Sequence, residues 1–328
     1  MNVLVTGGAG YIGSHMVKML AGAGHQVVTW DNLSTGFREA VRYGAFVEGD
    51  LHEHEHLVQT LRQFRVEAVV HFAARIEVGE SVREPHRYYE NNVGGTLSLL
   101  SAMREAEVRQ LVFSSTAAVY GEPEAVPIPE GHPQDPTNPY GASKCMVERI
   151  LRDGAAAGEV RSLSLRYFNA AGADPDGELG ERHDPETHLI PLALQAASGR
   201  REAIAILGRD YPTSDGTCIR DFIHVQDLCA AHLAALDYLS NGGDTVALNL
   251  GTGKGASVQS VIDTVSAVTG RQLQVEEGLR RPGDPAWLVA DPTRSRELLG
   301  WTPRISGLER IVEDAWRWEL AQCDQEVT

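Results

Sequence analysis

Residues 2–13 read NVLVTGGAGYIG, and this short stretch decides the fold. Residues 2–6 are rich in β-branched side chains and predict a strand, and beyond residue 13 apolar side chains recur at helical spacing. The glycines between them allow a tight turn, a close backbone approach to a pyrophosphate and close packing of helix on strand; they are Gly7, Gly10 and Gly13. The stretch therefore predicts a dinucleotide site at a helix N-terminus.

The next predicted strand, residues 26–30, ends at Asp31. Asp31 follows the glycine turn at the sequence spacing at which dinucleotide sites of this kind carry an acidic residue. A carboxylate there accepts hydrogen bonds from the adenosine ribose and repels a 2′-phosphate, so we expect NAD rather than NADP. The alternative is an ordinary turn that starts at Asp31 and Asn32, which would not require the preceding glycine spacing.

Residues 140–144 read YGASK, and apolar residues at 146, 147, 150 and 151 predict a helix over 140–154. Tyr140 and Lys144 would then share one face of that helix. A phenol normally has a pKa of about 10, but a fixed positive neighbour favours the phenolate. We therefore expect Tyr140 to be a general base assisted by Lys144. A Y-x-x-x-K pair alone is more often an ordinary surface pair, but here the glycine turn provides a cofactor for it to act on.

Thr116 lies in VFSSTAAVYG (residues 112–121), a buried strand that runs into a small hydroxylated loop. In open α/β sheets reactive groups lie at the carboxyl ends of the strands. We expect the Thr116 hydroxyl to hydrogen-bond a substrate alcohol beside Tyr140. Taken alone, Thr116 would be an ordinary strand-end turn residue.

Strands and helices alternate through the first half of the chain, with further strands predicted at 45–48, 68–71, 111–115 and 162–166 and helices near 53–64 and 86–106. This rhythm predicts an α/β fold with a doubly wound parallel Rossmann sheet. A glycine-, proline- and charge-rich run at 170–186 indicates a boundary, and residues 225–250 indicate a return to the sheet. We expect a dinucleotide domain at 1–172, completed by about 222–252, and a smaller, discontinuous lobe at 173–328.

The chain has 328 residues and a net charge of −16, with no stripe of Lys and Arg, so we expect no nucleic-acid partner. No stretch approaches the length of a membrane span, and Met1 leads directly into a strand, which predicts a cytoplasmic protein without a membrane partner. The four cysteines form no C-x-x-C pair, which fits a reducing compartment.

Further motifs follow in the same order as in extended short-chain dehydrogenases, namely GD at 49–50, HFAA at 71–74, VGES at 78–81, NNV at 91–93, RYFN at 166–169 and RDFIHV at 220–225. Over essentially the whole chain the sequence resembles the UDP-glucose 4-epimerases of that family. The resemblance implies bound NAD, interconversion of UDP-glucose and UDP-galactose through a 4-keto sugar reduced from its opposite face, and a UDP-sugar-binding lobe at 173–328. It also implies a homodimer formed through the helices near 86–106 and 140–154.

The resemblance assigns residues to roles by position. The catalytic residues are Tyr140, Lys144 and Thr116. The cofactor contacts are Gly7, Gly10, Tyr11, Ile12, Gly13, Asp31, Asn32, Asp50, Leu51, Phe72, Ala73, Ala74, Asn92, Ser114, Tyr140, Lys144 and Tyr167. The substrate contacts are Thr116, Tyr140, Phe168, Asn169, His188, Leu189, Arg220, Leu288 and the ends of the turn Arg281-Pro282-Gly283-Asp284. Arginines suit the substrate side because guanidinium binds phosphate oxygens in pairs.

Three positions depart from the family pattern. Ile76 stands where several relatives carry a lysine near the nicotinamide ribose, a contact that Arg75 could supply instead. His188 replaces an asparagine of some relatives. Leu288 falls near a bulky aromatic of epimerases restricted to the unacetylated sugar, so we expect UDP-N-acetylhexosamines to be accepted as well.

Other functions remain open at this stage. A sugar-nucleotide 4,6-dehydratase would need an acid and a base after the hydroxyl residue, where this chain has Ala117-Ala118. A 4-epimerase of a uronic acid or pentose is a closer alternative, whereas a non-catalytic NAD(H)-sensing protein would be expected to lose the Tyr140 and Lys144 pair.

Two motifs resemble metal or phosphate sites only superficially. HEHEH at 52–56 lacks the H-E-x-x-H spacing and is expected to be a solvated helix start, so no metal is predicted. GTGKG at 251–255 lacks P-loop spacing, and ATP hydrolysis is not expected.

Overall fold

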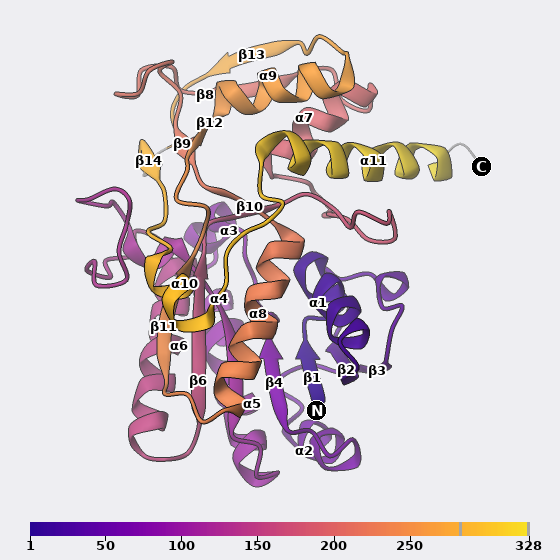
Figure 1. The fold of residues 1–328 in the computed structure, drawn as a ribbon, viewed down its shortest axis with the longest axis vertical. Coiled ribbons are helices and arrows are strands. Elements are labelled where there is room, and N and C mark those ends of the chain that lie inside the picture. Colours follow the sequence, from indigo (N-terminus) through magenta and orange to yellow (C-terminus); the bar gives the residue numbers. More distant parts are fainter. Residues whose placement is uncertain (282–283, 327–328) are drawn as a thin grey trace.

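The structure, a computed structural model, describes residues 1–281 and 284–326. Its centre is a seven-stranded sheet in the order β11-β6-β5-β4-β1-β2-β3 in which every neighbouring pair is parallel (Figure 1). The strands are β1 (Asn2–Thr6), β2 (Gln26–Asp31), β3 (Ala45–Glu48), β4 (Ala68–His71), β5 (Gln110–Thr116), β6 (Arg161–Tyr167) and β11 (Val246–Leu250). The strand order reverses between β1 and β4, and ligands of such sheets bind at the carboxyl ends beside this reversal.

Helices cover both faces of the sheet, and the alternation of side chains along β1 shows why. Val3 and Val5 join the apolar cluster of α1 (Tyr11–Gly22) and α8 (Val225–Ser240). Leu4 points to the opposite face, where it joins the cluster of α2 (His54–Gln63), α5 (Gly95–Glu105) and α6 (Pro139–Ala156). Two separate cores therefore hold the sheet between them, and α6, which carries Tyr140, belongs to the second.

A smaller lobe lies beyond the carboxyl ends of the central strands, at the top of Figure 1. Its core is formed by α7 (Leu189–Ser198), α9 (Val258–Thr269) and α11 (Leu308–Glu326). Short strands complete it and join it to the sheet: β8 (Ile204–Leu207) with β13 (Val275–Gly278), β7 (Asn169–Ala171) with β10 (Phe222–His224), and β12 (Ala256–Ser257) and β14 (Trp287–Leu288) on either side of β9 (Ile219–Arg220). Short helices α3 (Val78–Arg83), α4 (Pro85–Tyr88) and α10 (Thr293–Leu299) and 3₁₀ turns at Arg38–Ala40 and Ala117–Tyr120 fill the connections.

The predicted doubly wound parallel sheet with a smaller C-terminal lobe is confirmed. One local expectation differs, because the single helix expected near 86–106 is divided into α4, a π-helical segment at Tyr89–Gly94 and α5. Such wide turns often occur at functional sites, and this one holds Asn92. Among the described residues, no helix is long and apolar enough to cross a membrane.

Candidate active site

A cavity of about 390 Å³ opens at the carboxyl edge of the sheet, where the strand order reverses. The glycine turn, the ends of four central strands, α6 and the segment before α7 all contribute to its wall. Twenty of the residues predicted for the site line it: Gly7, Gly10, Tyr11, Ile12, Gly13, Asp31, Asn32, Asp50, Leu51, Phe72, Ala73, Ala74, Ser114, Thr116, Tyr140, Lys144, Tyr167, Phe168, Asn169 and His188. Residues far apart in the sequence are thus brought to one place.

The glycine turn forms a cradle in which Gly7 and Gly13 have no room for a side chain. Gly7 has a φ of +72°, and a Cβ there would lie 2.6 Å from the backbone nitrogen of Ala73. A Cβ on Gly13 would lie 2.1 Å from the carbonyl oxygen of Gly7. The bare backbone at the start of α1 leaves room for a pyrophosphate beside free helix N–H groups, so these residues fit a dinucleotide.

Asp31 lies at the end of β2 with its carboxylate fixed from both sides. Oδ2 accepts a hydrogen bond from the Ala9 amide at 2.9 Å and Oδ1 one from the Leu33 amide at 2.8 Å. Burial raises the pKa of Asp31, and these two hydrogen bonds oppose that rise. Nearby, Asn32 donates to Asp50 at 2.7 Å. The acidic residues therefore form one end of the cavity, where an adenosine ribose would lie.

The residues expected to do chemistry meet on the opposite side of the glycine turn. Asn138 caps α6 by accepting a hydrogen bond from the Gly141 amide at 2.9 Å, which places Tyr140 in the first turn. The Thr116 side chain, at the end of β5, hydrogen-bonds Tyr140. Lys144 donates from Nζ to the Ser114 carbonyl at 2.9 Å and lies 5.9 Å from the centre of the Tyr140 ring. A hydroxyl, a phenol and an amine are thus collected in one pocket.

The electrostatics of this trio differ from the expectation. Burial raises the pKa of Tyr140 to about 12, although the Thr116 hydrogen bond opposes the rise and Glu77 adds to it. Burial lowers the pKa of Lys144 to about 7. Burial thus dominates the Tyr140 pKa in this structure, where both side chains are desolvated and the ammonium is bonded to Ser114 rather than to the phenol.

A buried ion pair anchors the helix that carries this trio. Arg166 of β6 holds Glu148 of α6 with two hydrogen bonds of 2.9 and 2.6 Å, and both side chains are almost fully buried. Ser115 adds a hydrogen bond of 2.5 Å to Glu148. Glu148 lies one turn beyond Lys144 on the same stripe of α6, so the pair fixes the helix against the strand ends.

Six predicted residues lie outside the cavity wall. Asn92 is buried behind it, where its side chain accepts from the Arg75 amide at 2.8 Å and donates to Ser143 at 3.0 Å. Asn92 thus supports the Arg75 segment rather than facing the cavity. Leu189 belongs to the core of the lobe.

The other four lie around β9 and β14. Arg220 is bound to Asp284 at 2.6 Å, and Arg281 is exposed. Leu288 packs against the buried cluster of Val119, Tyr120 and Ile128, as does Phe168, which lines the cavity. Pro282 and Gly283 of the predicted turn lie outside the described residues.

Sequence reasoning missed several residues that line the cavity, among them Glu77, Glu181 and His183. Glu181 and His183 lie close to Glu186 and His188 in the segment before α7, and burial raises the pKa of Glu181 to about 7 against the opposing charge of His188. The spacing E-x-H-x-x-E-x-H over 181–188 was the available signal. In the HEHEH stretch, by contrast, the histidines share no carboxylate, since His54 contacts Glu105 and His56 contacts Glu53.

Comparisons with known proteins agree with this geometry. Residues 3–251 match the NAD dependent epimerase/dehydratase family. The chain is 51% identical to the UDP-glucose 4-epimerase of Rhizobium meliloti (strain 1021) over 317 residues, which cover 97% of this chain and 96% of that protein. The crystal structure of UDP-glucose 4-epimerase from Brucella ovis in complex with NAD superposes with a TM-score of 0.95 at 51% identity, covering 97% of this chain and 98% of that one. The UDP-Glc/GlcNAc 4-epimerase of Campylobacter jejuni superposes with a TM-score of 0.85 at 43% identity, covering 98% and 99%.

Proposed function

The chain belongs to the NAD dependent epimerase/dehydratase family, and from that premise we propose that it is an NAD-dependent UDP-glucose 4-epimerase. It interconverts UDP-glucose and UDP-galactose by oxidation at C4 and re-reduction from the opposite face, a reaction of galactose metabolism. The observation that carries the proposal is the meeting of Thr116, Tyr140 and Lys144 beside a glycine cradle in one cavity.

The cradle and Asp31 would hold NAD. Gly7, Gly10 and Gly13 would receive the pyrophosphate, and Asp31 would accept hydrogen bonds from the adenosine ribose. When bound, the nicotinamide supplies the redox chemistry, as acceptor and then donor of the hydride at C4. Lys144 and Tyr167 border the cavity at the nicotinamide end.

The protein's own groups move the proton. Tyr140 takes the proton of the sugar 4-hydroxyl at Oη and returns it to the product. Thr116, which already hydrogen-bonds Tyr140, orients the same hydroxyl. Because burial raises the Tyr140 pKa, the phenolate needs positive charge from the bound nicotinamide and from Lys144 in its protonated form. Burial of the trio also excludes water.

The substrate side is formed by Phe168, Asn169 and His188, which line the cavity beyond Tyr140. We propose that Arg220 and Arg281 bind the diphosphate when the sugar nucleotide enters. Arg220 would then exchange part of its contact with Asp284 for phosphate oxygens.

The rival readings predict different products. Ala118 stands where a dehydratase needs an acid or base, and its amide donates to Thr116 instead. Methyl groups transfer no proton, so elimination of water is disfavoured. The test is to supply UDP-galactose, UDP-glucuronic acid and a UDP-pentose without added NAD. UDP-glucose from UDP-galactose supports the proposal, whereas a 4-keto-6-deoxy sugar or turnover of the other substrates alone would replace it.

Replacing Thr116 with Val should lower turnover and leave NAD content unchanged, because the hydroxyl bonded to Tyr140 is lost while the volume is kept. Thr116→Ser is the matched control and should restore much of the activity, since it keeps the hydroxyl. Steady-state kinetics of wild type, Thr116→Val and Thr116→Ser measure the three turnover numbers. Equal turnover in wild type and Thr116→Val would make Thr116 only a cap for the Ala118 amide.

Asp31→Asn should weaken NAD binding and raise the affinity for NADP relative to NAD. Asn keeps an oxygen that can accept from the Ala9 or Leu33 amide, so the turn survives, while the charge that repels a 2′-phosphate is removed. Calorimetry of cofactor-stripped protein with both dinucleotides measures the ratio. An unchanged ratio would mean that a group other than Asp31 discriminates between NAD and NADP at the adenosine ribose.

The substrate range should include UDP-N-acetylglucosamine and UDP-N-acetylgalactosamine. Leu288 packs against the same apolar cluster as Phe168, which lines the cavity, and a leucine there leaves the hexose end more room than a tyrosine would. Leu288→Tyr should therefore reduce kcat/KM for the acetylated pair more than for the plain pair, by a difference of about 1–3 kcal/mol. Equal reductions of kcat/KM for both pairs of substrates would show that Leu288 does not control the substrate range.

Three further properties belong to the same proposal. Residues 1–172 with 222–252 form the NAD-binding domain, and the rest of 173–328 forms the UDP-sugar lobe.

The protein is a homodimer that pairs α5 and α6 with a second copy. The support for this is a groove between these helices that is lined by Leu97, Leu100, Met103 and Ile150; sedimentation would test it. Its four free cysteines suit the cytoplasm.

A further inference from the structure

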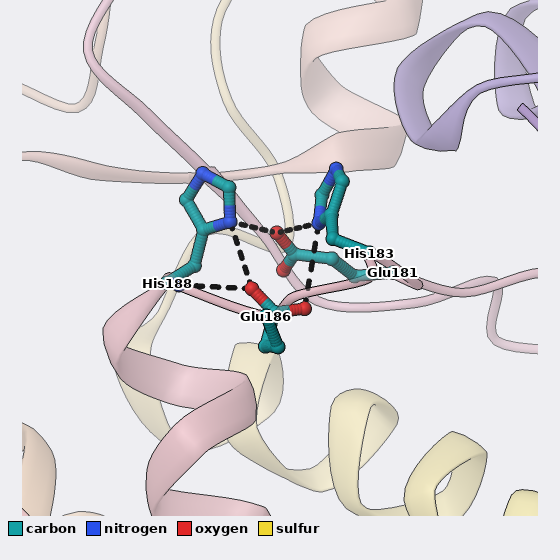
Figure 2. Close-up of side chains that lie close together, drawn as sticks. All are labelled: Glu181, His183, Glu186 and His188. Atoms are coloured by element: carbon teal, nitrogen blue, oxygen red, sulfur yellow. Dashed lines mark hydrogen bonds and ion pairs between the residues drawn. The ribbon is translucent and has the colours of Figure 1, made fainter. Parts of the chain in front are cut away.

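Four side chains of metal-binding type converge in the segment between β7 and α7. They are Glu181, His183, Glu186 and His188, and one ligand atom of each lies within 4.8 Å of all the others (Figure 2). A single short run of the sequence, E-x-H-x-x-E-x-H over residues 181–188, supplies all four. Three of them also line the active-site cavity.

Each histidine of this group faces both glutamates. His183 Nδ1 lies 3.5 Å from Glu181 and 3.4 Å from Glu186. His188 Nδ1 lies 3.1 Å from Glu181 and 3.0 Å from Glu186. Each Nδ1 carries at most one proton and can donate it to one carboxylate at a time. Each imidazole nitrogen therefore faces two carboxylates with at most one proton to share between them, whereas a metal ion would bind all of them at once.

The same spacing is natural around a metal ion. Zinc bonds to nitrogen and oxygen of about 2.0–2.2 Å place tetrahedral ligands roughly 3.3–3.6 Å apart. The four nitrogen–oxygen separations of 3.0 to 3.5 Å lie in or just below that range, and the remaining separations, within 4.8 Å, would shorten as the side chains close on an ion.

Burial and charge favour a divalent ion. The glutamate side chains are only 7% and 6% exposed, and two buried carboxylates with oxygens within 4.8 Å of each other require compensating positive charge. One divalent cation with two neutral imidazoles makes the site neutral. His188 is 39% exposed and leaves a path for entry.

We propose that Glu181, His183, Glu186 and His188 bind one divalent transition-metal ion of the Zn²⁺ type. Paired imidazole and carboxylate ligands suit such ions, whereas Mg²⁺ prefers oxygen ligands alone. The ion fastens the segment before α7 at the rim of the cavity, where His183 packs edge-on against Tyr11 of α1. No step of the epimerisation passes through it, and of its four ligands only His188 is also proposed as a substrate contact.

The test is a Zn²⁺ titration of full-length, untagged protein with its bound cofactor, after metal removal with a chelator and dialysis. Wild type should bind one Zn²⁺ per chain and gain thermal stability, with no response to Mg²⁺. His183→Asn and Glu186→Gln should each weaken binding by at least about tenfold. Co²⁺ in wild type should give the visible spectrum of a tetrahedral ion.

The matched control is the double variant His54→Asn/His56→Asn, which removes two exposed histidines that contact separate glutamates. It should bind Zn²⁺ as wild type does. Circular dichroism of the metal-free proteins separates lost binding from lost folding. The proposal is overturned if wild type binds no Zn²⁺, or if His183→Asn and Glu186→Gln, both folded, bind it as tightly as wild type.

Discussion

Tyr140→Phe should lower epimerase turnover by about 10² to 10⁴ while NAD remains bound. The substitution removes only the hydroxyl that takes the proton from the sugar and keeps the buried ring in place. The contact with Thr116 is lost with it. Turnover measured with saturating UDP-galactose, together with the NAD content of the purified protein, gives both quantities.

The pH profile sharpens this expectation. The base acts as phenolate, and burial raises the pKa of Tyr140, so turnover of wild type should increase as the pH rises from neutral toward alkaline values. In Tyr140→Phe that increase should disappear. Tyr43→Phe is the control, because it removes another hydrogen-bonded phenol, one that contacts Glu178 away from the cavity. Near-normal turnover of Tyr140→Phe would refute the assignment.

Arg166→Met should be the most destabilising of the single changes considered. Arg166 and Glu148 are 4% and 2% exposed and share two hydrogen bonds. Removal of the guanidinium leaves a buried carboxylate without its cation, which costs about 3–5 kcal/mol in free energy of unfolding. Turnover should fall too, because Glu148 holds the helix that carries Tyr140 and Lys144.

Two comparisons isolate this effect in urea denaturation. Arg149→Met breaks the exposed pair with Asp153 on the same helix, whose members are 70% and 60% exposed, and should cost less than about 1 kcal/mol. Adding Glu148→Leu to Arg166→Met should recover part of the loss, because the unpaired charge is then removed. A cost for Arg166→Met no larger than that for Arg149→Met would contradict the role given to the buried pair.

The parts of the fold that could be predicted depend on neighbours in sequence. The β1–turn–α1 unit is set by glycines that must approach Ala73 and Gly7 closely, and the start of α6 by the Asn138 cap before Tyr140. Such signals are local, so the sequence alone sufficed for the sheet, the cradle and the position of the base.

The parts that could not be predicted depend on burial and on distant partners. The pairing of Glu148 with Arg166 joins a helix to a strand that follows it, and no spacing rule indicates it. The direction of the Lys144 ammonium, toward Ser114 rather than Tyr140, is fixed by packing. The same holds for Leu288, which the pairing of β9 with β14 brings to the apolar cluster that Phe168 also packs against.

In the proposed reaction, one carbon of the sugar is oxidised and then reduced by the same enzyme-held cofactor. The most direct measurement supplies UDP-galactose carrying deuterium at C4, in ordinary water and without added NAD, and follows the product by NMR. We predict UDP-glucose that retains deuterium at C4. A product with hydrogen from solvent at C4, or no conversion by the NAD-containing protein, would contradict the account.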